Sequence, residues 1–526
     1  MSSFITLDGL SFRTPEGDSL FDNLTLAFGA ERTGLVGRNG VGKTTLIRLM
    51  LGELAPSSGS VATRGRIGVL RQALAPAPDA SLADLLGASE ALARLARIEA
   101  GEGDETDFAE ADWTLPARLD EALAQVGLTG IDLDRPAASL SGGQATRASL
   151  AGLLAGEPDL ILLDEPTNNL DAEARAMIAS ALAAWKGGAV VVSHDRSLLR
   201  PMDRIVELSS LGAKVYGGGY DLYVERKAQE EAAAARDLDN AERRVAQAAR
   251  DAQAAREKKA RRDAAGKRFA AKGTESRLFL GGQAERAENS GGREGRIAER
   301  LQGEAVGDLA QAQERVERLR RLDFALPPSR LSAGKTVLAF EEVAFAYPGE
   351  RPVIERLSFR MVGPERVAVV GPNGSGKTTL VKLAAGELQP TAGRVVSGAR
   401  TALFDQKTEM LWSGETLVEA FRRLNPDAGR NEAQAALARF LFRNTAAEKL
   451  VDALSGGERL RAALACTLMS ATPPQLLVLD EPTNHLDLDS IAAVEAALRG
   501  YDGAILVVSH DPDFLEAIGV ERRIAF

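Results

Sequence analysis

Residues 37–46 read GRNGVGKTTL, and residues 371–380 read GPNGSGKTTL. A short apolar run of the strand type precedes each segment, and a helical pattern follows it. Closely spaced glycines let a backbone wrap around phosphate with its N–H groups pointing inward, and the N-terminus of the next helix adds positive potential. Two copies in the same strand–loop–helix context predict two phosphate-binding loops in one chain.

Three further motifs occur twice, in the same order in both halves of the chain. They are LSGGQ at 140–144 and LSGGE at 454–458, LILLDEPTNNLD at 160–171 and LLVLDEPTNHLD at 476–487, and VVVSHD at 190–195 and LVVSHD at 506–511. The interval from Lys43 to Gln72 equals the interval from Lys377 to Gln406. A repeat of this length indicates a duplicated domain rather than a solenoid of short repeats.

One interval differs between the two halves. Residues 73–139 separate Gln72 from the first LSGG motif, whereas only residues 407–453 separate Gln406 from the second. The difference amounts to roughly one helical hairpin. Part of the longer interval is acidic (GEGDETDFAEAD, 101–112), so we expect a short arm there that repels phosphate.

The composition fits a multidomain protein of a reducing compartment. The 526 residues are 45% apolar and 26% charged, which is ordinary for globular chains. The net charge of -10 disfavours a protein that is basic throughout and binds nucleic acid. Cys466 is the single cysteine, and neither a signal peptide nor an apolar run of about 18 residues is evident. We expect a cytoplasmic protein; the membrane part of any transporter that it served would be another chain.

Residues 220–334 lie between the repeats and are rich in Ala, Arg, Glu and Gln. Small and apolar residues recur there at three- and four-residue spacing, which predicts two helices packed antiparallel along a narrow seam. The seam positions are Leu238, Ala241, Val245, Ala248, Ala252 and Ala255, and then Leu309, Ala312, Val316 and Leu319. The glycines of 281–295 would form the turn. A mostly disordered linker is the alternative, because large apolar residues are few.

The repeated motifs carry the groups that phosphoryl transfer requires. The lysine of the glycine-rich loop can reach the β- and γ-phosphates, and the threonine after it can hold Mg²⁺ together with an aspartate that ends an apolar strand. The glutamate after that aspartate can orient or deprotonate the attacking water. These residues are Lys43 and Lys377, Thr44 and Thr378, Asp164 and Asp480, and Glu165 and Glu481.

Glutamine and histidine also occur at matching positions. Gln72 and Gln406 close apolar segments and could sense the metal and the water. His194 and His510 each follow an apolar run and a serine, and we expect them to contact the γ-phosphate.

A Ser-Gly-Gly segment precedes a helical pattern in each half and offers a second phosphate-binding end. Within one domain this segment would duplicate the glycine-rich loop. Two domains packed head to tail would use both, because each nucleotide would be clamped by the loop of one domain and the Ser-Gly-Gly segment of the other.

With these motifs the chain resembles the ATP-binding cassette superfamily across 1–219 and 335–526, and the segments EPTNNLD and EPTNHLD resemble the ABC-F family. Members of that family are soluble twin-cassette proteins with a charged helical linker, and GGGYDLYVERK at 217–227 resembles the start of such a linker. The resemblance implies an α/β fold with two P-loop ATP-binding cassette domains, at 1–219 and 335–526, joined by a charged α-helical hairpin at 220–334. It also implies a monomer whose two cassettes pair with each other.

The resemblance further implies two composite sites for ATP and Mg²⁺. Site one would join Lys43, Thr44, Gln72, Asp164, Glu165 and His194 to Ser455, Gly456 and Gly457. Site two would join Lys377, Thr378, Gln406, Asp480, Glu481 and His510 to Ser141, Gly142 and Gly143. We expect catalysis by Glu165, Glu481, His194 and His510, and metal binding by Thr44, Gln72, Asp164, Thr378, Gln406 and Asp480. Further ATP contacts are expected from Gly37, Asn39, Gly40, Gly42, Thr45, Gln144, Tyr347, Gly371, Asn373, Gly374, Gly376, Thr379 and Glu458.

Two positions depart from the family pattern. Tyr347 is placed to stack on adenine in site two, whereas the aligned residue of the first half is Thr14, with Phe12 two residues away. Adenine stacking is therefore not expected in site one. The second signature ends in Glu458 where the first has Gln144, and we expect this change to matter little.

Residues 243–277 are basic within an acidic chain, with 12 Lys or Arg against 4 Asp or Glu. Such a segment is suited to RNA phosphates, and Phe269 could stack on a base. A solvated charged helix is the alternative. Family members bind ribosomes near the exit-tRNA site with the linker toward the peptidyl tRNA, so the resemblance implies the ribosome, with its rRNA and tRNA, as the partner.

Three hypotheses for the function follow. The leading one is a translation-factor-like ATPase on the ribosome, of which antibiotic resistance by ribosome protection is a specialisation. The rivals are the ATPase subunit of a membrane transporter and a DNA-associated, repair-type ATPase. An integral membrane partner would favour the first rival, and equal ATP-dependent binding to naked DNA and to ribosomes would favour the second.

Overall fold

The computed structural model describes residues 3–15, 17–71, 77, 79–168, 170–209, 212–270, 300, 303–304, 306–309, 326–349, 351–405 and 410–526. The chain forms two compact units, Met1–Tyr223 together with Leu322–Phe526, and Val224–Arg321. The first unit contains both repeats, which we call the first half (up to residue 219) and the second half (from residue 335). The second unit contains most of the linker.

A mainly parallel sheet forms the centre of each half. In the first half the order is β5-β6-β7-β3-β8-β9, with β9 antiparallel to β8. These strands are β3 (Arg32–Gly37), β5 (Ile67–Leu70), β6 (Leu160–Asp164), β7 (Gly188–Val192), β8 (Arg204–Ser209) and β9 (Gly212–Gly217). In the second half the order is β14-β15-β16-β12-β17, all parallel. These strands are β12 (Arg366–Val370), β14 (Thr401–Phe404), β15 (Leu476–Asp480), β16 (Ala504–Val508) and β17 (Arg522–Ala525).

A smaller antiparallel sheet accompanies each parallel sheet, in the orders β2-β1-β4 and β11-β10-β13. Its strands are β1 (Ile5–Arg13), β2 (Ser19–Phe28) and β4 (Ser58–Thr63) in the first half, and β10 (Thr336–Phe345), β11 (Ile354–Val362) and β13 (Ala392–Ser397) in the second. The matching orders show that the sequence repeat is a repeat of structure.

Alternating side chains of each central strand pack on two different layers. In β15, Leu476 and Val478 belong to the core shared with the antiparallel sheet, whereas Leu477 and Leu479 belong to the core under the helices. A strand buried on both faces needs a continuous apolar run, which LLVLD supplies. Each such buried side chain stabilises the fold by about 1.5–3 kcal/mol. The run ends at Asp480, so the first polar group lies at the carboxyl edge of the sheet.

The helices of the two halves correspond except in one place. The first half has α1 (Lys43–Met50), α2 (Leu82–Leu85), α3 (Ser89–Glu99), α4 (Glu105–Glu110), α5 (Leu115–Gln125), α6 (Gly142–Ala155), α7 (Ala172–Ala184) and α8 (Arg196–Leu199). The second has α11 (Lys377–Ala385), α12 (Leu417–Leu424), α13 (Arg430–Arg439), α14 (Gly456–Leu468), α15 (Leu488–Arg499) and α16 (Pro512–Ala517). The pair α3 and α4 has no counterpart among the described residues of the second half.

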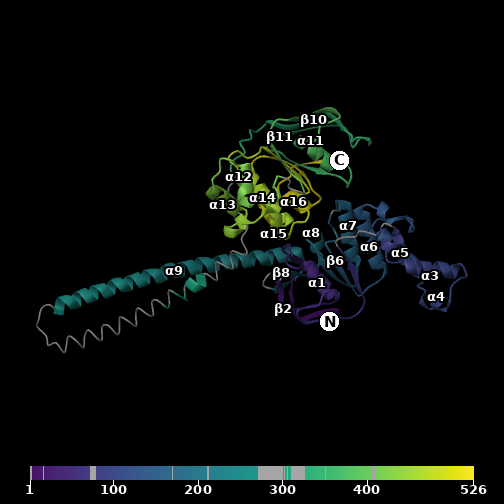
Figure 1. Ribbon diagram of the computed structural model, residues 1–526, viewed down its shortest axis with the longest axis horizontal. Helices are drawn as coiled ribbons and strands as arrows, with labels where there is room; N and C mark the ends of the chain where they lie inside the picture. Colours follow the sequence, from purple (N-terminus) through teal and green to yellow (C-terminus); the bar gives the residue numbers. More distant parts are fainter. Residues whose placement is uncertain are drawn as a thin grey trace. The chain divides into compact units, whose positions relative to one another are not determined.

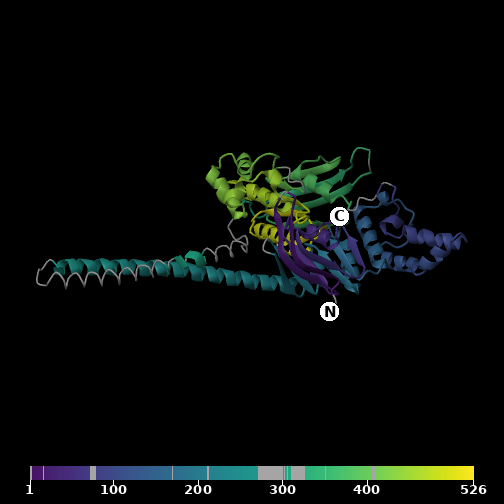
Figure 2. The same cartoon turned by 60° about the horizontal axis from the view of Figure 1, so that its bottom comes forward.

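The additional residues in the longer interval of the first half therefore form one helical hairpin, α3 and α4, as the difference in length predicted. Both views show this hairpin on the side of the first half away from the antiparallel sheet (Figure 1 and Figure 2). Its acidic stretch is partly neutralised, because the buried Asp107 pairs with Arg97 and lies 3.7 Å from Arg94. Repulsion of phosphate by this stretch stays a prediction, and it would depend on the acids that are exposed.

The linker begins as one continuous helix, α9 (Tyr220–Ala270) (Figure 1). Ala241 and Ala252 are buried and Leu238, Val245 and Ala248 are half-buried, so these predicted seam positions do share the covered face. For 220–270 the structure thus has the helical form of the two predicted alternatives.

Only a short part of the predicted second arm is described. Residues 303–304 and 306–309 are helical, and Asp308 lies 3.6 Å from Arg244 of α9. The turn at 281–295, the side chain of Ala255, and the seam residues Ala312, Val316 and Leu319 lie outside the described residues. Across the part of the chain that is described, no helix has the length and apolar character that a membrane span requires.

Candidate active sites

The two glycine-rich loops have the backbone that phosphate binding requires. Gly42 and Gly376 cap α1 and α11 in the left-handed region, with φ of 103° and 99°. A Cβ on Gly42 would lie 2.7 Å from the ring of Phe21, and a Cβ on Gly376 would lie 2.6 Å from Val353. Glycine is required at both positions because any side chain would be strained and would clash.

The loop lysines are held inside their loops. Lys43 Nζ donates to the carbonyl oxygens of Gly37 at 2.7 Å and Arg38 at 3.1 Å. Lys377 Nζ makes the matching bonds, at 2.9 and 2.8 Å, to Gly371 and Pro372. Burial lowers the pKa of both lysines, while nearby carboxylates of the same site oppose the shift. Each loop therefore holds a fixed cation at the place where phosphate would bind.

The aspartates that end β6 and β15 face the first residues of the loop helices. Thr44 Oγ1 donates to Asp164 Oδ2 at 2.9 Å, while Asp164 Oδ1 is buried and has no hydrogen-bond partner among the described residues. Burial raises the pKa of Asp164 and of Asp480, and hydrogen bonds from Thr44 and Thr378 oppose this. A hydroxyl beside a buried, under-coordinated carboxylate is a fitting oxygen set for Mg²⁺.

The next residue in each half is a glutamate that faces a histidine. His194 Nε2 lies 3.2 Å from Glu165 Oε1, and His510 Nε2 lies 3.3 Å from Glu481 Oε1. Both glutamates have the left-handed backbone that non-glycine residues rarely adopt, with φ of 49° and 48°. Such strain persists only where the surroundings impose it, and it aims both carboxyl groups in the same way.

Burial sets the protonation of these pairs. It raises the pKa of Glu165 to about 8 and that of Glu481 to about 7, and it lowers the pKa of His194 to about 3 and that of His510 to about 4. At neutral pH both imidazoles are therefore uncharged, so each 3.2–3.3 Å contact is a close approach of a neutral imidazole to a carboxyl group rather than an ion pair. A carboxyl with a pKa near neutrality is suited to accept a proton from water.

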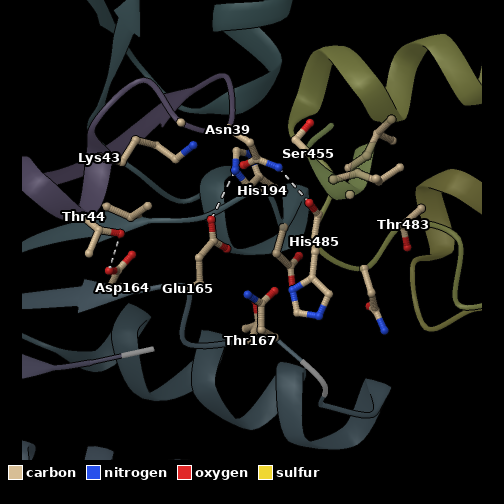
Figure 3. A pocket seen from close by; sticks show the side chains of 18 of the residues that line it. Asn39, Lys43, Thr44, Asp164, Glu165, Thr167, His194, Ser455, Thr483 and His485 are labelled. Atoms are coloured by element: carbon tan, nitrogen blue, oxygen red, sulfur yellow. Dashed lines mark hydrogen bonds and ion pairs between the residues drawn. The ribbon is translucent and has the colours of Figure 1, made fainter. Parts of the chain in front are cut away.

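Site one is completed by the second half (Figure 3). Its pocket is lined by Lys43, Thr44, Asp164, Glu165 and His194 together with Ser455, Gly456, Thr483, Asn484 and His485. The two halves also bond directly: Asn39 N donates to Asp487 Oδ2 at 2.9 Å, and Asn39 Nδ2 donates to the carbonyl oxygen of His485 at 2.8 Å. The glycine-rich loop of one half thus faces the signature helix α14 of the other, as head-to-tail pairing predicts.

Site two is less complete. Its pocket contains Lys377, Thr378, Asp480, Glu481 and His510, with Tyr347 at one side. Asn373 N donates to Asp171 Oδ2 at 3.3 Å, which mirrors the bond between Asn39 and Asp487. The first half adds Leu170 to the lining, but Ser141, Gly142 and Gly143 are not among the described residues that line this pocket. The expected composite site two is therefore not closed by its signature segment in this conformation.

Comparisons with known proteins identify the family. The model of the ABC transporter family matches residues 22–168 and 354–484. The tylosin resistance ATP-binding protein TlrC of Streptomyces fradiae is 34% identical, over 97% of this chain and 95% of its own length. The ATP-binding protein Uup of Caulobacter vibrioides is 34% identical, over 95% of this chain and 73% of its own length.

The chain belongs to the ABC-F family of ATP-binding cassette proteins. It is accordingly an ATPase with two ATP-binding cassettes. A solved structure of the archaeal ribosome recycling factor aABCE1 with a ribosomal stalk protein has the same fold, with a TM-score of 0.61 at 20% identity over 98% of this chain and 87% of that one.

Most residues predicted from the sequence meet at the two sites of this ABC-F chain, but several do not. Gln72 and Gln406 lie outside the described residues. Gly37 and Gly371 offer their carbonyl oxygens to the loop lysines rather than lining the pockets.

The last residues of the signatures, Gln144 and Glu458, have a structural role that the sequence did not predict. Their side chains turn back to accept from the N–H of Ser141 at 2.9 Å and of Ser455 at 3.0 Å, which completes a capping box at the start of α6 and α14. Their contact with ATP stays a prediction. Because Glu and Gln can both accept this bond, the change between the halves has a structural reason to matter little.

The two pockets of the ABC-F chain differ in the residues at the side where adenine was expected to stack. Tyr347 is exposed, and its hydroxyl lies 3.1 Å from Thr379 Oγ1. Thr14 does not line the pocket of site one; Leu20 of β2 does. A tyrosine ring is thus present in site two, while the lining of site one contains no Phe, Tyr or Trp among the described residues.

Sequence reasoning missed the residues that join the halves. Asp171 and Asp487 cap α7 and α15 and also accept the loop N–H groups of the opposite half. His485 lies in the repeated EPTNHLD segment, and its backbone oxygen accepts from Asn39 Nδ2. The sequence signal for these residues was the repetition of the whole EPTN-x-LD segment. The catalytic glutamate accounts only for the first residue of this segment, so the repetition of the remaining residues indicated a second role.

Proposed function

We propose that this ATPase hydrolyses ATP at two composite sites with equivalent chemical groups. Lys43 and Lys377 bind the β- and γ-phosphates, and Glu165 and Glu481 accept a proton from the attacking water. His194 and His510, as neutral imidazoles, orient the γ-phosphate and the glutamate. The two glutamate–histidine contacts, equal within 0.1 Å and built on the same strained backbone, support this assignment.

Mg²⁺ fits the residues at each site. Thr44 with Asp164, and Thr378 with Asp480, would hold the ion, and the unpartnered Asp164 Oδ1 is the observation that supports it. Gln72 and Gln406 would add ligands. When bound, the ion would neutralise charge that develops on the phosphates.

We further propose the boundaries 1–219, 220–334 and 335–526 and a monomer in which the two cassettes pair within the chain. Supporting these limits, α9 begins at Tyr220 and β10 begins at Thr336. The bonds from Asn39 to Asp487 and from Asn373 to Asp171 support pairing within the chain. We also propose a cytoplasmic location; Cys466 is the single cysteine, and it is buried and free.

The function that these features support best is action on the ribosome, driven by ATP. The curated relative that matches this chain from end to end is named for tylosin resistance, which favours the ribosome-protection specialisation. The family resemblance supplies the exit-tRNA site as the place of binding. A membrane transporter subunit and a DNA-associated ATPase stay as alternatives for the experiment below.

The linker offers a surface for RNA. Arg250, Arg261 and Arg268 are exposed and, at spacings of 11 and 7 residues, lie within about 20° of one another around α9. The seam residues Ala241 and Ala252 lie on the opposite side of the helix. Arginines aligned along about 27 Å of helix can contact successive phosphates of an RNA backbone.

Ribosome co-sedimentation of the Glu165→Gln/Glu481→Gln variant, with ATP and without nucleotide, tests the proposal. We expect the variant to pellet with ribosomes only when ATP is present, because it binds ATP but hydrolyses it very slowly. If it stays in the supernatant under both conditions while it still binds ATP, the ribosome proposal is wrong.

Two parallel samples decide between the alternatives. Equal ATP-dependent binding to naked DNA would favour the DNA-associated ATPase, and recovery with membranes would favour the transporter subunit. The variant Arg250→Gln/Arg261→Gln/Arg268→Gln should bind ribosomes with a shallower salt dependence, because fewer counterions are released. Arg243→Gln is the matched control, since Arg243 is on the same face but is paired with Asp239 at 2.7 Å.

A further inference from the structure

Arg196 of α8 and Arg200, which caps the end of this helix, join the two halves of the chain. Arg196 Nη2 lies 2.7 Å from Glu495 Oε1 of α15, and both side chains are about nine-tenths buried. Arg200 Nη2 donates to Asp513 Oδ1 of α16 at 2.7 Å. We call Arg196, Arg200, Glu495 and Asp513 the α8 junction. All of its cations come from the first half and all of its anions come from the second.

The α8 junction is connected to the catalytic loop by a short, fixed path. Asp195, which follows His194, caps α8 by accepting from Ser197 N at 3.0 Å, and its other oxygen lies 3.8 Å from Arg175. Only Asp195 separates His194 from Arg196. A shift of Arg196 would therefore move the backbone that aims the His194 imidazole at Glu165.

The partner helix of the junction also reaches site one. Glu495 lies on α15, whose N-cap, Asp487, accepts the hydrogen bond from Asn39 in the glycine-rich loop of site one. The pair between Arg196 and Glu495 thus ties the histidine loop to the helix that already holds the phosphate-binding loop. A buried ion pair is a demanding contact that fixes one arrangement, because either charge left alone would be costly.

Site two has no such junction. The repeats align His194 with His510 and Asp171 with Asp487 at one constant offset. This offset puts Pro512 in the place of Arg196, Ala179 in that of Glu495, Glu516 in that of Arg200 and Ser197 in that of Asp513. None of these residues can form the equivalent ion pairs, so the α8 junction is present at site one and has no equivalent at these positions of site two.

The junction extends to the first turn of the linker helix. Arg200 Nε donates to Asp221 Oδ1 of α9 at 3.3 Å, while its Nη2 holds Asp513. Arg200 therefore bridges the base of α9 and the second half. Tyr220, also in this turn, is half-buried, and desolvation raises the pKa of its hydroxyl while the charge of Arg196 opposes the shift.

We propose that Arg196 is a positioning residue for site one: its ion pair with Glu495 holds the loop of His194 against the second half, and Arg200 ties this arrangement to the first turn of α9. This inference rests on the catalytic roles proposed above for Glu165 and His194. Turnover at site one, and not at site two, depends on the α8 junction. The α8 junction thereby connects site one, but not site two, to the second half and to the first turn of α9.

The test is the variant Arg196→Gln/Glu495→Gln, which removes both charges and leaves neither buried alone. In a Glu481→Gln background, which isolates site one, we expect kcat to fall about tenfold, since small misplacement of a catalytic group has effects of this size. KM for ATP should change by less than about twofold, because the junction does not touch the nucleotide. In a Glu165→Gln background, turnover should be unchanged. Arg196→Lys, which keeps the charge, should restore most of the kcat.

Arg423→Gln/Glu415→Gln is the matched control, because it removes a 2.6 Å ion pair of similar chemistry from α12, away from both pockets. It should leave both sites unchanged. An equal loss at the two sites, or no loss at site one, would overturn the inference. So would the loss of all turnover in each single background, because the two sites would then act as one.

The exposed Arg200 provides a second variant if the buried double substitution fails to fold. Arg200→Gln should lower the kcat of site one about threefold and spare site two, and Arg200→Lys should restore it. An unchanged site one would again contradict the junction. Normal turnover in Glu165→Gln/Glu481→Gln would instead refute the catalytic roles themselves, so the two failures are distinguishable.

Discussion

Sites one and two carry the same motifs but differ in the residues that close each pocket and in those at its base side. Site one is lined by Ser455 and Gly456 of the opposite half, whereas no residue of the first signature lines site two. Site two has Tyr347 at its side, whereas site one has Leu20. The difference shows that duplication preserved the groups that meet the phosphates and allowed the base side and the closing contacts to diverge.

The divergence also affects the carboxylates. Burial raises the pKa of Glu165 to about 8 but that of Glu481 only to about 7. Lys43 is the main charge that opposes the shift at Glu165, whereas Arg175 of the first half is the main one at Glu481. The residue that aligns with Arg175 is Ile491, so the second half offers no cation at the equivalent position of site one.

The largest effect is expected from removing both catalytic carboxylates. Glu165→Gln/Glu481→Gln should slow ATP turnover by at least about a hundredfold, the scale of losing one positioned catalytic group. Nucleotide binding should persist, because neither change removes a phosphate contact. Steady-state phosphate release and equilibrium nucleotide binding measure the two quantities, and the single variants divide turnover between the sites.

The control for this prediction is Glu415→Gln, a carboxylate outside both pockets, which should retain turnover. Near-normal turnover in the double variant would show that another group activates the water. Equal shares from the two single variants would show that the different surroundings do not matter for the rate.

The base side of the pockets should give the next largest effect. Tyr347→Ala should weaken ATP binding at site two about tenfold, since stacking of a base on an aromatic ring is worth about 1–3 kcal/mol. Tyr347→Phe should keep the affinity, because it loses only the contact with Thr379. Titration of a fluorescent ATP analogue into the Glu165→Gln/Glu481→Gln variant would resolve two affinities.

The matching change in the first half is Thr14→Ala, which should leave both affinities unaltered. Weaker binding at site one in this variant, or none of the expected loss with Tyr347→Ala, would remove the proposed difference in base recognition between the two sites.

The pKa difference predicts two pH profiles. A carboxyl group that acts as a base works when it is deprotonated, so turnover falls as pH falls through its pKa. Site one, measured in Glu481→Gln, should reach half its maximum near pH 8, and site two, measured in Glu165→Gln, near pH 7. The histidines should not contribute above pH 5, because burial lowers their pKa to about 3 and about 4.

Initial rates of ATP hydrolysis between pH 5.5 and about 9 measure both profiles. Circular dichroism over the same range checks that the protein stays folded, so that a loss of rate is not caused by unfolding. Superimposable profiles would mean that the surroundings of Glu165 and Glu481 are equal during catalysis. A profile that rises as pH falls would assign the catalytic proton to an acid instead.

The motifs predicted the chemistry of each site better than the relation between the sites. Glycines, Lys43, Asp164 and Glu165 are identified by local sequence, because strand, loop and helix follow one another within a few residues. The bonds of Asp171 and Asp487 could not be read in this way, since they join residues more than 200 positions apart. The linker seam was predictable for 238–252 because its period is local to one helix.

The missed features are side chains with a second use. Gln144 and Glu458 belong to motifs, and their position suggested ATP contacts, but the same spacing of three residues from Ser141 and Ser455 also completes a capping box. Spacing alone cannot decide between the two uses. The α8 junction was missed because Arg196 and Arg200 lie just outside the repeated VVSHD segment, where the halves no longer agree.

The smallest expected effect would sharpen the comparison of the signatures. Ser455→Ala and Ser141→Ala each remove a side-chain cap, which costs about 1 kcal/mol of stability in either half. Denaturant unfolding should therefore shift by a similar amount in both variants. Turnover should respond differently: Ser455→Ala should slow site one about fivefold because Ser455 lines that pocket, whereas Ser141→Ala should leave site two nearly unchanged. Equal slowing of both sites would mean that Ser141 also closes on nucleotide during the cycle, so that the open site two is one stage of a symmetric mechanism rather than a lasting difference between the halves.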